Sequence, residues 1–129
     1  MEFFYAVNTG QMYLRAGEDT LEIDRGYSGY KEYRNSVRFE KAKLLGPIPR
    51  GVWTVGFGQA HPRLGPQAIP LEIEEGDIFG RSGFFIHGEN GFVNFTASTG
   101  CIVLGRSARD CIDHLSRRAG VRRLVVTEL

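Results

Sequence analysis

The chain has 129 residues, of which 42% are hydrophobic and 24% charged, and its formal net charge is +1. This composition is typical of a single globular domain, residues 1–129, and excludes a disordered or fibrous chain. The small net charge gives no bulk attraction to nucleic acid, and no stretch approaches the ~20 apolar residues of a membrane span. We therefore expect no nucleic-acid partner and no membrane insertion.

Charged residues are unevenly placed along the chain. Acidic side chains cluster at Glu72, Glu74, Glu75 and Asp77, and six arginines follow in the C-terminal part, at Arg106, Arg109, Arg117, Arg118, Arg122 and Arg123. Such runs usually form solvated surface, and no aromatic residue beyond Phe95 interleaves with the arginines as an RNA-binding surface requires. We expect both groups to be exposed.

The first part of the chain has strand patterns. Residues 2–7 and 11–15 are rich in β-forming side chains, and the loop Asn8-Thr9-Gly10 between them holds a glycine suited to positive φ, which predicts a β-hairpin. Residues 21–23 predict a third short strand. Residues 25–46 then form a long polar stretch. Loops of that length are usually functional, so we expect it to be a lid or wall of a site.

Proline and glycine dominate the middle of the chain. The segment Gly46–Gly51 (GPIPRG) predicts a rigid turn, because two prolines fix φ while the flanking glycines permit unusual values. It leads into a predicted strand at residues 52–55. The Gly/Pro-rich segment 56–70 is expected to be a loop, followed by strands at 71–74 and 84–86.

One helix is predicted, late in the chain. Ser107 and Asp110 match the S-x-x-D capping pattern, and apolar residues recur at helical spacing, at Ala108, Cys111, Ile112 and Leu115. Gly120 is expected to end the helix, and residues 121–127 predict a final strand. The expected fold class is therefore mainly β with one α-helix.

The residues that carry chemistry are concentrated in the segment 84–105. His87 follows an apolar strand, and Cys101 comes directly after the small residues Ser98-Thr99-Gly100. A catalytic thiol needs access to substrate, a nearby base, and backbone N–H groups that can hold an oxyanion. We predict Cys101 as a nucleophile and His87 as its base, with the Gly100 and Cys101 amides directed at the reacting carbonyl oxygen.

Other interpretations of these residue types stay open. A free cysteine is most often a buried apolar residue, and we favour that interpretation for Cys111 on the apolar face of the helix. A disulfide between Cys101 and Cys111 would block catalysis. His61, expected in an exposed loop, and His114, expected at the edge of the apolar helix face, lack metal-ligand spacing. We therefore predict no metal and no cofactor.

The segments IHGEN (86–90) and ASTGCIVL (97–104) resemble the H-G and S-x-G-C signature of the YkuD-type L,D-transpeptidases. They are more similar still to a small family of L,D-transpeptidase-like toxins that bacteria deliver by type VI secretion. Tyr27-Ser28-Gly29 and the segment Gly46–Trp53 also resemble motifs of that family. The resemblance covers residues 27–106.

The resemblance implies a YkuD-like β-sandwich or barrel with one helix after the cysteine loop. It implies Cys101 as nucleophile, His87 as base, and an oxyanion site and pocket shaped by Ser98, Thr99, Gly100 and Gly88. The implied substrate is the tetrapeptide stem of peptidoglycan, cleaved between meso-diaminopimelate and the terminal D-Ala. Water would complete an L,D-carboxypeptidase reaction, a D-amino acid would complete an exchange, and a second stem would give a cross-link.

One position departs from the pattern of the family. Many L,D-transpeptidases carry arginine two residues after the cysteine, where this chain has Val103. Substrate binding then falls to other residues, and Arg106, Arg81 and Asn90 are the candidates. A guanidinium suits this role because it can bind a carboxylate through two hydrogen bonds. The group that orients His87 stays open between a nearby asparagine and a backbone carbonyl.

The first residues, MEFFYAVNTG, lack the basic and apolar regions of a signal peptide, so we expect synthesis in the cytoplasm. The resemblance implies export by a type VI system to the periplasm of a target cell, and a cognate immunity protein as partner. An excised catalytic domain would fit the same N-terminus.

Two other functions stay open. One is a non-catalytic peptidoglycan-binding module, and the other is a different cysteine amidase, against which the order of His before Cys counts. A catalytic Cys101 is expected to react with alkylating agents well below about pH 8.5, whereas a non-catalytic thiol is expected to have ordinary reactivity.

Overall fold

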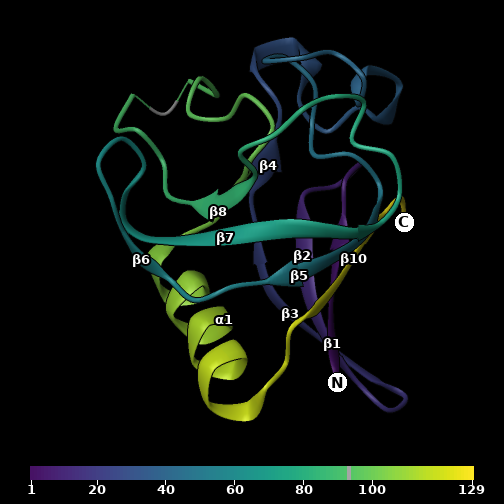
Figure 1. Cartoon of the computed structure of the whole chain (residues 1–129), viewed down its shortest axis with the longest axis vertical. Helices are drawn as coiled ribbons and strands as arrows, with labels where there is room; N and C mark the ends of the chain where they lie inside the picture. The colour runs from purple at the N-terminus through teal and green to yellow at the C-terminus, as the bar shows by residue number, and fades with distance from the viewer. Residues whose placement is uncertain (93) are drawn as a thin grey trace.

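Ten strands within the described residues, 1–92 and 94–129, form one mixed sheet in this computed structural model (Figure 1). The strand order is β3-β2-β1-β10-β5-β7-β8-β9-β4, with β6 paired to β7. The strands are β1 (Glu2–Ala6), β2 (Gln11–Ala16), β3 (Asp19–Arg25), β4 (Tyr27–Ser28), β5 (Gly51–Val55), β6 (Gln59–His61), β7 (Gly65–Glu75), β8 (Phe85–His87), β9 (Ile102–Val103) and β10 (Arg123–Thr127). One α-helix, α1 (Arg106–Ala119), lies between β9 and β10 in the chain. The predicted fold class, mainly β with one late helix, is confirmed for this part of the chain.

The N-terminal hairpin forms as predicted. β1 and β2 pair antiparallel, and Gly10 lies in the turn with φ +81. A Cβ at Gly10 would overlap the carbonyl oxygen of Gly26, so the turn requires glycine for space as well as for its backbone angle. The third strand, β3, is longer than the predicted residues 21–23 and pairs with β2.

Apolar side chains from the central strands and α1 form one core cluster, which includes Phe3, Tyr5, Trp53, Ile69, Ile86, Ile112 and Leu124. The ring of Trp53 on β5 packs edge-on against Phe84, with 4.9 Å between centroids. Its Nε1 donates to the carbonyl of Pro49 at 3.1 Å. The core therefore joins the proline-rich turn to the residues that precede His87.

The segment 56–70 forms a β-hairpin rather than the expected loop. β6 pairs antiparallel with the start of β7, and residues 62–64 form the turn between them. The prediction was wrong because glycine and proline often interrupt strands, whereas here Gly65 begins β7 with φ +85 and Pro66 lies at the strand start, where proline is tolerated. His61 is consequently half-buried in β6, and its Nδ1 accepts two backbone N–H groups of the turn.

Helix α1 begins and ends at glycines. Gly105 is the N-cap and no side chain caps the first turn, so the predicted capping role of Ser107 is wrong. Gly120 ends the helix as predicted, with φ +68 in the left-handed region. No helix among residues 1–92 and 94–129 is long and apolar enough to span a membrane.

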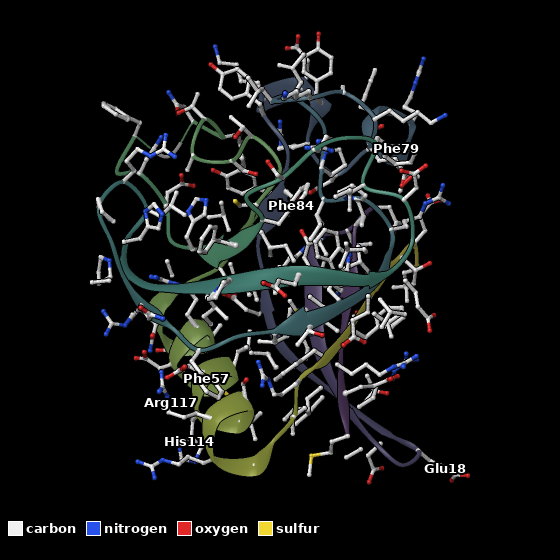
Figure 2. The ribbon with its side chains drawn as sticks, viewed as in Figure 1. Glu18, Phe57, Phe79, Phe84, His114 and Arg117 are labelled. Atoms are coloured by element: carbon white, nitrogen blue, oxygen red, sulfur yellow. The ribbon has the colours of Figure 1, made fainter. Side chains whose placement is uncertain are left out.

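The buried face of α1 consists of Ala108, Arg109, Ile112 and Ser116. Cys111 is exposed, so the prediction that it lies on the apolar face is wrong. His114 is also exposed, and Figure 2 shows it on α1, far from Phe84. The buried face includes polar residues because it covers the end of β5, where Ser116 Oγ donates to the carbonyl oxygens of Val55 and Gly56.

The charged clusters are exposed, with one exception. The acidic side chains on β7 and in the turn after it are exposed as expected, at Glu72, Glu74, Glu75 and Asp77. Five of the six C-terminal arginines are exposed too, at Arg106, Arg117, Arg118, Arg122 and Arg123. Arg109 is buried at 7% exposure, which corrects the expectation for that residue.

The irregular segments gather at the end of the molecule opposite α1 (Figure 1). The stretch 25–46 lies there together with the loop that connects β8 to β9. Tyr27 and Ser28 pair with Val103 and Ile102, so the start of this stretch is attached to the edge of the sheet. Two short 3₁₀ helices follow, at Lys31–Tyr33 and Val37–Phe39.

Candidate active site

His87 is the last residue of β8, and Cys101 immediately precedes the neighbouring parallel strand β9. In the pairing of β8 with β9, His87 is opposite Val103 and Ile86 is opposite Ile102. The pairing therefore brings the loop that ends at Cys101 next to the strand that carries His87.

The thiol of Cys101 is nearly buried, with 9% of the residue exposed. It faces a cavity of about 130 Å³ whose walls include Lys43 and Leu44, so the stretch 25–46 supplies a wall of this cavity. The Sγ atom lies 3.5 Å from the carbonyl oxygen of Gly83. Burial raises the pKa of Cys101 to about 11, although the Phe85 amide and Arg81 act in the opposite direction. The thiol is therefore protonated at neutral pH, contrary to the expected thiolate.

His87 is more deeply buried, with 3% of the residue exposed. Its Nδ1 lies 2.8 Å from the carbonyl oxygen of Gly88. A carbonyl can only accept, so Nδ1 carries the proton and Nε2 keeps a free lone pair. Burial lowers the pKa of His87, and the neighbouring Arg109 and His61 lower it further, while the Gly88 carbonyl and Glu89 oppose the shift. His87 is therefore a neutral imidazole oriented by a backbone carbonyl.

The two candidate catalytic side chains face different cavities. His87 lines a cavity of about 430 Å³ together with Gly88, Asn90 and Arg109. No hydrogen bond joins Cys101 to His87 among the hydrogen bonds of the described residues. In this state the pair consists of a neutral thiol and a neutral imidazole, and no preformed ion pair is present.

Ser98 fixes the loop that carries Cys101. Its side chain is fully buried and its Oγ donates to the carbonyl oxygen of Cys101 at 2.6 Å. Ser98 Oγ also accepts the N–H groups of Gly29 at 2.9 Å and of Gly100 at 3.2 Å. The Gly100 amide is thereby occupied, so the expected use of that amide for an oxyanion is not available in this arrangement.

Ser28 makes the matching contacts from the other side of the loop. Its Oγ donates to the Gly100 carbonyl at 3.1 Å and accepts the Ile48 N–H at 2.8 Å. Ser28 and Ser98 together join three of the four segments with a resemblance to family motifs: residues 27–29, the proline-rich turn, and the cysteine loop. These segments are far apart in the sequence and meet around Cys101.

Arg81 was expected to bind substrate, but the structure gives it a supporting position. It is buried at 3% exposure and donates to four backbone carbonyl oxygens, those of Glu40 (2.6 Å), Pro47 (2.8 Å), Gly46 (2.9 Å) and Thr99 (3.3 Å). A Cβ at Gly100 would lie 2.5 Å from Arg81 Nη2, so glycine is needed there. Both terminal nitrogens of Arg81 are engaged with the backbone that surrounds Cys101.

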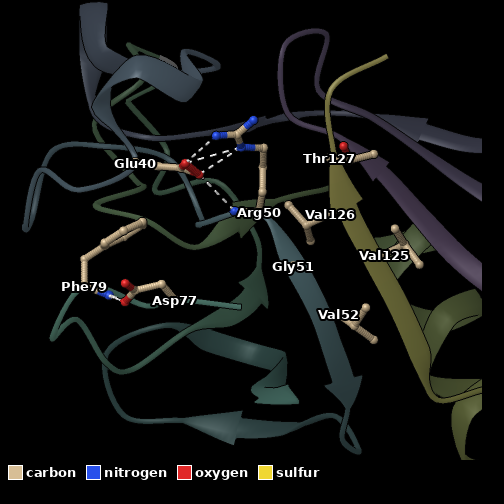
Figure 3. Close-up of a pocket in the computed structure, with 9 residues that line it drawn as sticks. All are labelled: Glu40, Arg50, Gly51, Val52, Asp77, Phe79, Val125, Val126 and Thr127. Carbon is tan, nitrogen blue, oxygen red and sulfur yellow. Dashed lines mark hydrogen bonds and ion pairs between the residues drawn. The ribbon is translucent and has the colours of Figure 1, made fainter. Parts of the chain in front are cut away.

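Glu40, whose carbonyl oxygen accepts a hydrogen bond from Arg81, is itself fixed through its side chain. It is held by Arg50, with 3.0 Å between Arg50 Nη2 and Glu40 Oε2 (Figure 3). The pair borders a separate hollow of about 510 Å³ that β5, β10 and Phe79 also line. That hollow contains neither of the candidate catalytic residues, and we assign the ion pair a structural role.

The other predicted substrate-binding residues lie at the rim. Arg106 is exposed and pairs with Asp110 one helical turn away, at 3.0 Å. Asn90 is exposed and its amide donates to Thr96 at 2.9 Å. Thr99 is exposed and lines the Cys101 cavity. Asn90 therefore neighbours His87 without orienting it.

Arg109 is the residue near the site that the sequence did not identify. It lines the His87 cavity from α1, and a Cβ at Gly88 would lie 2.7 Å from its Nη2 atom. Its position three residues before Ile112 and seven before Ser116 places it on the buried face of the helix. That spacing could have identified it, but its charge led to an assignment to the surface.

Within the described residues, no group of three or more histidine, cysteine or acidic side chains is arranged to hold a metal ion. Cys101 and Cys111 are both free, so no disulfide joins them.

No protein family model and no curated protein sequence matches the chain. Among solved structures, the chain is similar to one described as the structure of Bdellovibrio bacteriovorus Bd1075, with a TM-score of 0.54 and 16% sequence identity. The similarity covers 96% of this chain and 46% of the other, so this chain spans about half the length of Bd1075. At this identity the similarity concerns the fold alone.

Proposed function

We propose that the protein is a cysteine L,D-carboxypeptidase or L,D-transpeptidase of the YkuD type. Its substrate is the tetrapeptide stem of peptidoglycan, and the bond cleaved joins the L-centre of meso-diaminopimelate to the terminal D-Ala. The observation that carries the proposal is the pairing of β8, which ends at His87, with β9, which Cys101 precedes, together with the hydrogen bonds that join three of the motif segments around the cysteine loop.

The reaction follows from the protonation states of the two residues. The Cys101 thiol gives its proton to Nε2 of His87 as the sulfur attacks the carbonyl carbon, because no thiolate is present beforehand. The C–N bond then breaks, and His87 returns the proton to the nitrogen of the departing D-Ala. A thioester on Cys101 remains. Water, a free D-amino acid or the amine of a second stem attacks the thioester, and the thiol is restored.

Burial supports this order of events. A neutral thiol and a neutral imidazole cost little to hold in a desolvated site, whereas an ion pair would need compensating hydrogen bonds. The Phe85 amide and Arg81 both favour the thiolate and stabilise negative charge as it develops on the sulfur. Proton transfer coupled to attack therefore suits the electrostatics around Cys101.

The test is turnover of purified tetrapeptide muropeptides, followed by chromatography and mass spectrometry. Wild type is expected to release D-Ala and leave the tripeptide, and Cys101→Ala is expected to lower the rate by at least ~1,000-fold because the nucleophile is lost. Cys111→Ser is the matched control, since that cysteine is exposed on α1, and it should retain the full rate. Equal turnover by wild type and Cys101→Ala would refute the proposal.

A second candidate is a non-catalytic peptidoglycan-binding module of the same fold. One observation favours it: the buried thiol and the imidazole face separate cavities. In the same assay this module would bind the muropeptide but release no D-Ala, and Cys101→Ala would behave as wild type does.

The cellular role belongs to the same proposal. The resemblance to type VI toxins supports delivery into the periplasm of a target cell, where loss of the terminal D-Ala would remove tetrapeptide donors from cross-linking. A cognate immunity protein that covers the site would protect the producing cell.

A further inference from the structure

Arg109 is a buried cation whose described contacts include no carboxylate. The residue is 7% exposed, and its donors reach three neutral carbonyl oxygens: Pro66 (2.7 Å) and Gln67 (3.1 Å) from Nη1, and Gly105 (3.3 Å) from Nε. Among the described residues, neither an ion pair nor a hydrogen bond involves Nη2. A guanidinium held in this way is positioned by the protein but keeps donors for an anion.

The unused nitrogen lies at the His87 cavity. A Cβ at Gly88 would be 2.7 Å from Nη2, so the absence of a side chain at position 88 lets the guanidinium lie directly against the backbone next to His87. Arg109 and His87 also line the same cavity of about 430 Å³. The nearby Glu89 carboxylate accepts the Tyr27 hydroxyl at 2.9 Å and does not pair with Arg109.

We infer that Arg109 binds the terminal carboxylate of the D-amino acid that leaves the substrate. This inference rests on the proposed function, in which His87 protonates the nitrogen of the departing D-Ala. The carboxylate carbon of D-Ala is two bonds from that nitrogen, so the group that binds it must lie beside His87. Arg109 meets that requirement, and a charge-assisted pair with a carboxylate is strongest where water is excluded.

The other two arginine candidates meet the requirement less well. The terminal nitrogens of Arg81 donate to backbone carbonyls, and Arg81 lines the cavity of Cys101 rather than that of His87. Arg106 is exposed and already paired with Asp110. Of these three arginines, Arg109 is the one that lines the His87 cavity and has an Nη2 atom without a hydrogen bond to the described residues.

The substrate itself provides the first test, which needs no variant. Wild-type protein is given the tetrapeptide stem as the free acid and as its C-terminal amide, which removes the negative charge. We expect kcat/KM for the amide to be lower by about 100-fold, because a buried cation is left without a partner. Equal kcat/KM for the two substrates would overturn the inference while leaving the proposed function intact.

A series of variants tests whether Arg109 is the residue that distinguishes the free acid from the amide. Arg109→Gln should remove the preference, so that the ratio of kcat/KM for the acid to kcat/KM for the amide falls to about 1, and Arg109→Lys should keep part of the preference for the acid. Arg118→Gln, an exposed position on the same helix, should discriminate as wild type does. An Arg109→Gln protein that still prefers the acid by about 100-fold would contradict the assignment.

Binding without turnover separates this inference from the reaction. Cys101→Ala protein, titrated calorimetrically with the free acid and the amide, should bind the acid more tightly by ~10- to 100-fold. Tighter binding of the acid would support the role of Arg109 in binding the carboxylate. If the wild-type protein cleaved neither peptide, the same result would support this role of Arg109 while refuting the proposed reaction. Equal affinities would count against Arg109.

Discussion

Burial favours the neutral form of both candidate catalytic residues, Cys101 and His87. Desolvation disfavours the charged form of each group, so it raises the pKa of Cys101 and lowers that of His87. The buried charges around the two residues are those of Arg81 and Arg109, whose guanidinium groups donate hydrogen bonds to backbone carbonyls. At the scale of the residue, backbone carbonyls fix the two arginines, and burial favours the neutral forms of Cys101 and His87.

The reactivity of the thiol tests this description. With a pKa of about 11, Cys101 should be alkylated by iodoacetamide at pH 7 about 100-fold more slowly than an ordinary cysteine, since only the thiolate reacts. Its rate should rise with pH until the pH approaches 11. The two cysteines can be followed separately by peptide mass spectrometry.

Exposed Cys111 in the same molecule is the internal reference, and Cys111→Ser protein removes any competition between the two thiols. A Cys101 profile that levels off below pH 8 would indicate a preformed ion pair with His87. It would support the expectation based on sequence rather than the one based on burial.

At the scale of the element, helix α1 links the fold to the site. Its glycine ends set its length, and its buried face carries Arg109 to the His87 cavity while Ser116 binds the end of β5. The face is therefore polar at two positions where an amphipathic pattern predicts apolar residues. The close approach of Arg109 to Gly88 depends on how this helix packs against β7.

The helix ends give a matched pair of stability predictions. Ser107→Ala should change the free energy of unfolding by less than about 0.5 kcal/mol, because Ser107 lies inside the helix and makes no cap. Gly120→Ala should destabilise by about 1 kcal/mol, because a Cβ is strained at φ +68. Urea unfolding of both variants measures the difference. A loss of about 1 kcal/mol in Ser107→Ala would restore the capping role predicted from sequence.

At the scale of the whole molecule, one sheet joins both ends of the chain and the site. β1 pairs in parallel with β10, and the edge strand β4 pairs with β9 next to the cysteine loop. Ser28, Ser98 and Arg81 then tie the irregular segments to this frame through buried hydrogen bonds. A change in the core is therefore expected to reach the site.

Trp53 offers a direct measure of that coupling, since it is the one tryptophan in the sequence. It is 1% exposed, packs edge-on against Phe84 and donates to the carbonyl of Pro49, so its fluorescence should report the core and the proline-rich turn together. We expect its emission to shift to longer wavelength in the same urea transition that far-ultraviolet circular dichroism follows. Two separated midpoints would mean that the site region unfolds independently of the sheet.

The sequence by itself determined the features that depend on local pattern. β-forming side chains, short apolar runs and the glycines and prolines that flank them gave the N-terminal hairpin, β5, β8 and β10. Apolar residues at helical spacing gave α1, and glycine correctly marked the end of the helix. His87 and Cys101 were singled out because of their immediate neighbours. Glycine and proline were misread in the segment 56–70, because a hairpin turn and a loop have the same local composition.

Only the tertiary structure decided the features that depend on distant contacts. Whether Arg81 or Arg109 faces a ligand depends on carbonyl groups from other elements, and the pKa of Cys101 depends on burial by segments far away in sequence. Ser98 and Ser28 acquire their roles in the same way, since their partners lie 69 and 72 residues away. Short hydrogen bonds and desolvation act through space, so a pattern along the chain does not specify them.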